Sequence, residues 1–189
     1  MRKIGLVLIL AGLAPAPAAA DIKDVARDYF AAHQQTWSSN PVLLAAVRSQ
    51  NGANSGLGQA QILALDSQWR QEVGMAAQPT ISPVLNAPAS EILREYVAAS
   101  DGLISEFYMM DKLGMNVAVA SVSTDYWQGD EEKFTASYLL GNGAVHVSDV
   151  DFDESSQTFS VQVSFTLTDP FDGTPIGAMT VGLNAEALD

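Results

Sequence analysis

The 189-residue chain contains no cysteine, which excludes disulfide bonds and a lipid anchor attached through cysteine. Cations are also scarce, because nine Lys and Arg stand against 22 Asp and Glu, and the formal net charge is −13. Nucleic acids and anionic membranes are bound through a surplus of Lys and Arg, so neither is an expected partner. The acidity by itself favours a protein that stays in solution.

Long apolar runs are absent after residue 20, where no segment approaches the roughly 18 to 20 apolar residues that span a membrane. The first twenty residues differ, since Arg2 and Lys3 precede the apolar stretch 4–13 and the small residues 18–20 follow it. This is the pattern of a secretory signal peptide. We therefore expect cleavage near Ala20, a periplasmic or secreted protein, and a single mature domain whose seven cations and 22 acids give −15.

Apolar residues in the first half of that domain recur every three or four positions, which predicts amphipathic helices. The predicted helices cover 22–37, 42–50, 62–74 and 90–99, so that the helical part extends over 21–102. Asn40 followed by Pro41 is a typical start for the second of them, because the asparagine caps backbone amides and proline fits the first helical position.

Beyond Gly102 the apolar period changes to two, which predicts an antiparallel sheet over 103–189. Five strands are expected, at 103–111, 115–123, 145–152, 158–168 and 176–183. A loop and a short helix at about 130–140 separate the second strand from the third. The fold class is therefore α+β, with helices on one face of a five-stranded sheet and a loop-helix flap over the other.

The loop 125–133 holds two aromatic residues, an amide, four acids and a lysine. A hairpin needs only Gly, Asn or Asp at fixed positions, so this composition exceeds what a turn requires. We interpret the segment as a lid over a ligand.

Four segments resemble the Cache family, the extracytoplasmic PAS-like sensor domains also called PDC domains. They are 107–111, 116–121, 124–131 and 177–183, of which Asp-Tyr-Trp-Gln-Gly-Asp at 125–130 is the most specific. Residues 62–72 are also similar to the helical part of small stand-alone secreted members. The resemblance implies a PAS-like sheet, a small ligand between sheet and flap, and a part in signal transduction.

The sequence departs from the amino-acid-binding relatives at one point. Those relatives use an arginine near the flap tryptophan to hold a carboxylate, whereas no arginine follows Arg94 here and Lys112 and Lys133 are the cations of that region. Lysine cannot form the bidentate pair that arginine forms. The sequence therefore does not favour an amino-acid ligand.

The candidate ligand-binding residues combine aromatic, acidic, cationic and hydroxyl groups. They are Trp127, Asp125, Tyr126, Lys133, Tyr138, Asp149, Tyr108 and Ser121. Structural roles compete with this interpretation: Trp127 also suits a core position under the flap, Asp125 a turn, and Lys133 a solvated surface. Tyr138 is expected to pack on the sheet, from where its hydroxyl could still reach a ligand, and Asp130 is expected to cap the short helix.

No catalytic or metal motif occurs: Gly-x-Ser-x-Gly, a phosphate-binding glycine loop and His-Glu-x-x-His are all missing, and the two histidines are far apart. We therefore expect a sensor domain rather than an enzyme, with no metal and no cofactor. Its expected partners are a small polar or cationic ligand and a separate membrane receptor, or a second copy bound through the N-terminal helices. The alternatives are an interaction module with a vestigial pocket and a periplasmic hydrolase.

Overall fold

The helical half of the computed structural model has five helices, and the structure describes residues 21–153 and 157–188, so the predicted signal peptide lies outside it. The helices are α1 (Ile22–Ser38), α2 (Pro41–Ala53), α3 (Gln59–Glu72), α4 (Ile81–Leu85) and α5 (Pro88–Ala98). The Asn40 side chain accepts hydrogen bonds from the amides of Val42 and Leu43, as the predicted cap requires. The sequence did not predict α4, because five residues are too few to show a helical period.

The antiparallel sheet has six strands: β1 (Ile104–Met110), β2 (Asn116–Val119), β3 (Val145–Val147), β4 (Asp151–Asp153), β5 (Thr158–Thr168) and β6 (Pro175–Asn184). Their order is β2-β1-β6-β5-β3, and β4 also pairs with β5. The predicted strand 145–152 is thus two strands, because the chain leaves the ladder after Ser148. The predicted α+β class with an antiparallel sheet is confirmed.

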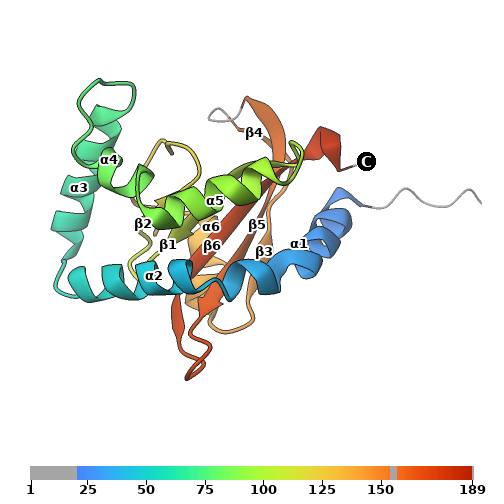
Figure 1. Ribbon diagram of the computed structural model, residues 1–189, viewed down its shortest axis with the longest axis horizontal. Helices are drawn as coiled ribbons and strands as arrows, with labels where there is room; N and C mark the ends of the chain where they lie inside the picture. Colours follow the sequence, from blue (N-terminus) through green and yellow to red (C-terminus); the bar gives the residue numbers. More distant parts are fainter. Residues whose placement is uncertain (1–20, 154–156, 189) are drawn as a thin grey trace, which may run out of the picture.

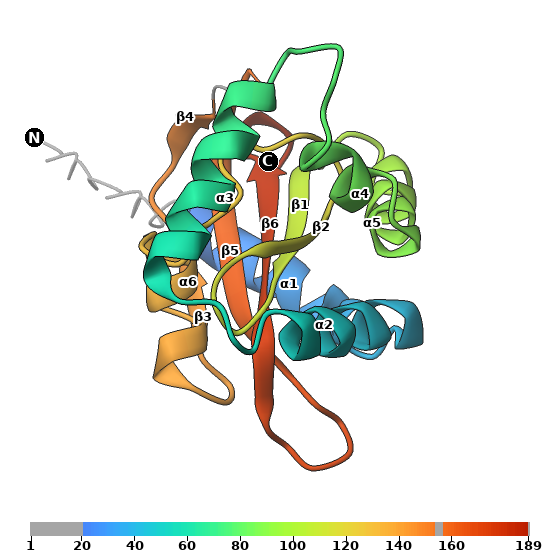
Figure 2. The same ribbon diagram turned by 90° about the vertical axis from the view of Figure 1, so that its left-hand side faces the viewer.

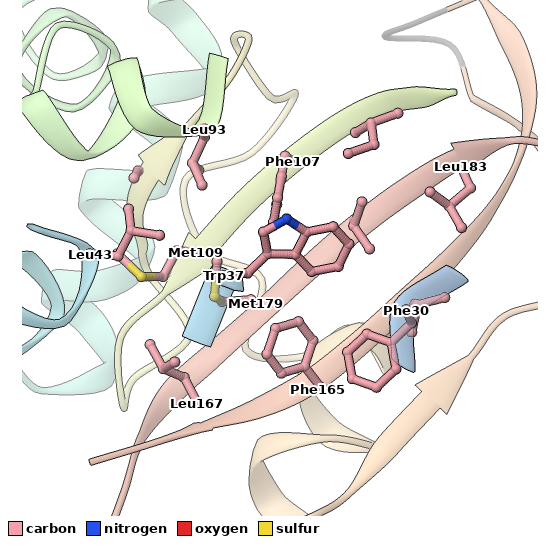
Figure 3. Packing of buried hydrophobic residues seen from close by; sticks show 14 of the residues in the cluster. Phe30, Trp37, Leu43, Leu93, Phe107, Met109, Phe165, Leu167, Met179 and Leu183 are labelled. Carbon is pink, nitrogen blue, oxygen red and sulfur yellow. The ribbon is translucent and has the colours of Figure 1, made fainter. Parts of the chain in front are cut away.

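One face of the sheet is apolar and packs against α1, α2 and α5 (Figures 1 and 3). Trp37 of α1 lies against Phe107 of β1 in an edge-to-face contact, with 5.1 Å between ring centroids. Phe30 packs on Phe165 of β5 at 4.9 Å. These contacts form the main core, and they explain why the first helix carries one buried stripe.

The helices α3 and α4 do not share this position. They lie at the end of the molecule near β2 (Figures 1 and 2), and their side chains Trp69, Ile81 and Val84 join a second cluster with residues of the opposite sheet face. The expectation that all N-terminal helices cover one face is therefore wrong for α3 and α4. Their apolar side chains pack with the flap side of the sheet instead.

The polar side of β5 is largely buried, as the predicted flap over this face requires. Ser160, Ser164 and Thr166 are at most 6% exposed, and Thr180 of β6 donates a hydrogen bond to the Ser164 hydroxyl at 2.9 Å. A covering element removes this face from water. The cover consists of the flap loop with α6 (Glu132–Thr135) and the 3-10 turn Tyr138–Leu140.

Candidate functional site

The flap is attached to α3 through a buried carboxylate. Asp66 Oδ1 accepts hydrogen bonds from the backbone amides of Tyr126 at 2.9 Å and Trp127 at 3.0 Å. Arg70, one turn further along α3, donates to Asp66 Oδ2 at 2.8 Å and pairs with Asp125 Oδ1 at 3.1 Å. The helix therefore holds three consecutive flap residues, and an arginine reaches the flap from α3 although none occurs nearby in sequence.

Trp69 adds a second attachment between the same elements. Its indole N–H donates to the Ser123 carbonyl oxygen at 2.8 Å, and its ring stacks on Tyr126 with centroids 5.0 Å apart and an interplanar angle of 3°. Tyr126 thus faces α3. Its contacts fix the flap in position over the sheet.

Trp127 is not where the sequence analysis expected it. The indole N–H donates to the Leu113 carbonyl oxygen at 2.7 Å, and the backbone pairs with Met115, so the side chain lies over the β1–β2 turn. Gly129 leaves room for the ring, because a Cβ at that position would overlap it. The bridge to Met115 directs Trp127 away from the space beneath the flap, and it is not among the residues that line the cavity described next.

A cavity of about 520 Å³ lies between the polar sheet face and the flap. Its walls come from β1, β4, β5, the flap and the segment between β3 and β4. The lining residues are Glu106, Tyr108, Ser123, Thr124, Gln128, Glu131, Glu132, Lys133, Ser148, Asp149, Asp151, Phe152, Ser160 and Gln162. The volume lies within the range of small-molecule sites in proteins.

Three of the eight predicted site residues line this cavity, namely Tyr108, Lys133 and Asp149. The other five lie elsewhere, because each has another role or position. Asp125 pairs with Arg70, Tyr126 stacks on Trp69, Trp127 covers the turn, Tyr138 stacks on Phe134 at 5.0 Å, and Ser121 is exposed. Ligand binding by the first three remains a prediction.

The floor of the cavity is a hydrogen-bonded polar network. Gln162 of β5 donates to Glu106 Oε1 at 2.5 Å and to the Tyr108 hydroxyl at 3.2 Å. Lys133 donates to the same hydroxyl at 3.1 Å and pairs with Glu131 at 2.9 Å. Lys133 is therefore mostly enclosed, with 14% of its side chain exposed, and is not the solvated lysine of the alternative interpretation.

The rim of the cavity is acidic and more open. Asp149 is 92% exposed and pairs with Lys23 of α1 at 2.5 Å, and the hydrogen bond and charge of Lys23 lower the pKa of Asp149. Asp151 and Phe152 of β4 complete this side. Asp149 was expected beneath the flap, but it lies at the mouth because the segment between β3 and β4 follows the edge of the sheet.

Sequence reasoning missed most of the lining. Glu106 was detectable as a charged residue inside an otherwise apolar strand, and Ser160 and Gln162 as the polar set of an alternating strand. The polar set was left out of the predicted site, because the sequence did not show which of its side chains lie beneath the flap. Asp130 is exposed and does not cap α6, which has Glu131 at its N-cap position without a side-chain bond.

The phenol of Tyr126 provides a test of the flap packing. Burial, with a smaller contribution from the charge of Asp111, raises the pKa of Tyr126 to about 12. Because the unfolded chain ionises near the ordinary tyrosine pKa of about 10, folding stability should fall as pH rises from there towards 12. Tyrosinate absorbs in the ultraviolet, and the part of this absorbance that the wild type shows and Tyr126→Phe lacks should appear near the raised pKa of about 12. Ionisation of Tyr126 near the ordinary tyrosine pKa would contradict this packing.

Within residues 21–153 and 157–188, none of the helices is both long and apolar enough to cross a membrane. Within the same ranges, no three His, Asp or Glu side chains are grouped so that they could hold a metal ion.

Comparison with known proteins gives similarity in structure alone. No family model matches the chain, and no curated protein matches it. The ligand-binding domain of the Campylobacter jejuni chemoreceptor Tlp3, solved with 4-methylisoleucine, is 14% identical, with a TM-score of 0.44 over 81% of this chain and 64% of that one. The Pseudomonas fluorescens chemoreceptor CtaA domain with L-serine is 10% identical, with a TM-score of 0.41 over 76% and 56%.

The Vibrio cholerae histidine kinase DctB sensor domain is 12% identical, with a TM-score of 0.41 over 82% of this chain and 58% of that one. The chain spans less than two thirds of each of these three proteins. Two of the three are ligand-binding domains of chemoreceptors, and the third is the sensor domain of a histidine kinase. At these TM-scores the likeness is limited to the general arrangement of helices and strands.

Proposed function

We propose that this protein is an extracytoplasmic Cache-like sensor domain that binds a small polar or cationic molecule in the cavity between sheet and flap. The observation that carries the proposal is the cavity of about 520 Å³ over a buried polar sheet face. Buried polar groups need hydrogen-bond partners, and a ligand on this floor would supply additional ones. The flap closes the site from above and is held by Asp66 and Trp69.

The proposal includes export and a partner. The signal-peptide pattern of residues 1–20 supports a periplasmic or secreted location. A ligand-bound domain of this kind would present its ligand state to a membrane receptor. Lys23 of α1 contacts Asp149 at the cavity rim, so the first helix is the element through which occupancy of the cavity would reach a partner.

A blocked cavity tests the proposal. Thr124 is exposed and lines the cavity, so Thr124→Trp should fill its mouth without disturbing the core. Ser67→Trp, which places the same ring on the exposed surface of α3, is the matched control. Compounds from a set of amines, amino acids, organic acids, sugars and nucleosides should raise the melting temperature of the wild type and of Ser67→Trp, but not of Thr124→Trp. If no compound stabilises the wild type, the cavity is not a ligand site.

A further inference from the structure

The charges around the cavity are unequal. The described part of its lining has five carboxylates, those of Glu106, Glu131, Glu132, Asp149 and Asp151, and one ammonium group, that of Lys133. Lys133 pairs with Glu131, and Lys23 pairs with Asp149 from outside the cavity. Even with both lysines counted, the acids are in excess, and a negative potential in a cleft attracts cations and repels carboxylates.

The acids form two groups at opposite sides of the cavity. Glu106 lies on the floor in β1, with 5% of its surface exposed, and Asp151 lies at the rim in β4. Strand pairing gives the path between them. Glu106 lies opposite Gly182 of β6, Gly182 lies opposite Gln162 of β5, and Ser160 of β5 lies opposite Asp151. Three strand spacings of about 4.8 Å place roughly 14 Å between the two strands that carry these acids.

The floor is built to hold its carboxylate. Glu106 lies opposite Gly182, and a Cβ on Gly182 would overlap the Glu106 side chain and come within 2.8 Å of its Oε1. The strand therefore needs glycine at this position to leave space for the acid. Gln162 donates a hydrogen bond to it and so fixes its orientation.

Aromatic rings lie at both sides of the same cavity. The Tyr108 ring already has an ammonium group over it, that of Lys133, 5.0 Å from the centroid. Phe152 lines the rim beside Asp151 and makes an edge-to-face contact with Phe159 at 5.4 Å. Such surfaces accept methylene groups and attract ammonium groups. They suit an aliphatic chain that joins two cationic ends.

A carboxylate on the ligand would find a poor partner. Lys133 already bonds Glu131 and Tyr108. Arg70, the arginine that reaches the flap, is held by Asp66 and Asp125 and does not line the cavity. Among the described residues that line the cavity, therefore, none is an arginine that could give a carboxylate a planar, two-point contact.

We infer that the ligand is a linear aliphatic diamine or polyamine without a carboxylate, bound with one ammonium group at Glu106 and another at the rim carboxylates Asp149 and Asp151. This inference rests on the proposed function, because it specifies the ligand of the same cavity. The chain between the ammonium groups lies along Tyr108 and Phe152.

Three probes with the same five-carbon chain test the ligand class by titration calorimetry: cadaverine, pentylamine and δ-aminovalerate. Cadaverine should bind about tenfold more tightly than pentylamine, because one charged contact is added, and more tightly still than δ-aminovalerate. Salt should weaken cadaverine binding more than pentylamine binding. Spermidine is longer than cadaverine, and its affinity shows whether a longer chain reaches both acidic groups better.

Variants assign the two ends. Asp151→Asn should weaken cadaverine about tenfold and leave pentylamine unchanged, whereas Glu106→Gln should weaken both. Asp28→Asn, which removes one charge from an exposed position on α1 outside the cavity, is the control and should change neither. Because Asp151 is exposed, its variant keeps the test valid even if Glu106→Gln fails to fold.

The outcomes separate the two proposals. If δ-aminovalerate binds as tightly as cadaverine, the diamine inference is wrong and the cavity remains a ligand site. The diamine inference is also wrong if none of these probes binds but another compound stabilises the protein. If Thr124→Trp abolishes that stabilisation, the cavity is still a ligand site. If no compound of any class binds, both proposals fail.

Discussion

Replacing Trp69 with alanine should lower the free energy of unfolding by about 3–5 kcal/mol, the range for a large aromatic side chain removed from a core. Trp69 is fully buried in the second cluster, beside Met110 and Phe134. The substitution removes this packing, the stacking on Tyr126 and the hydrogen bond to the Ser123 carbonyl oxygen. The flap therefore loses its main apolar attachment to α3.

Urea denaturation, followed by far-ultraviolet circular dichroism, measures this loss. Trp69→Phe keeps an aromatic ring for Tyr126 but lacks the N–H donor, and should lose clearly less stability than the alanine variant. Leu63→Ala on the same helix is the control, because Leu63 is 47% exposed. If Trp69→Ala were no less stable than Leu63→Ala, the anchoring of the flap by α3 would be wrong.

Substituting Gly177 by alanine should lower the free energy of unfolding by about 1–3 kcal/mol, the usual cost of added volume in a packed interior. A Cβ at this position of β6 would overlap the Met110 carbonyl oxygen of β1 and come within 3.1 Å of Val47 on α2. A carbonyl oxygen in a central strand cannot move without distortion of the β1–β6 ladder. The loss should therefore lie near the upper end of the range.

Gly56→Ala provides the comparison, because a Cβ there would meet no atom within 4 Å. Its stability in the same denaturation series should stay within about 0.5 kcal/mol of the wild type. Since both substitutions add one methyl group, their difference isolates the close approach of β6 to β1. Equal stabilities for the two variants would show that the two strands are not so closely packed at Gly177.

Four of the five N-terminal helices were predictable because each of their signals is local. The buried stripe of α1 is set by its own apolar spacing, and the start of α2 by the asparagine and proline at 40 and 41. The hairpin between β1 and β2 likewise follows from a local signal, because Gly114 has the left-handed conformation, with φ of 80°, that favours glycine in a tight turn. The expected strand 145–152 was less accurate, because its division depends on how Ser148 pairs with Gln162 of β5.

The site was only partly predictable because its residues come from segments that are distant in sequence. The flap composition correctly indicated a cover over the sheet. It did not show that Trp127 would bond Leu113 or that Asp125 would pair with Arg70 of α3. A tryptophan and an aspartate have several partners available, and the partner that they meet depends on how helices and strands pack.

The sequence by itself determined the α+β class, the boundaries of α1, α2, α3 and α5 to within a few residues, the acidic character and the presence of a covering loop, because these depend on composition and on periodicity along the chain. The tertiary structure alone decided which side chains line the space between the sheet and the flap, among them Glu106, Lys133 and Asp151. Strand order and the docking of α3 on the flap bring these side chains together. Those contacts join residues far apart along the chain, and no short sequence pattern specifies them.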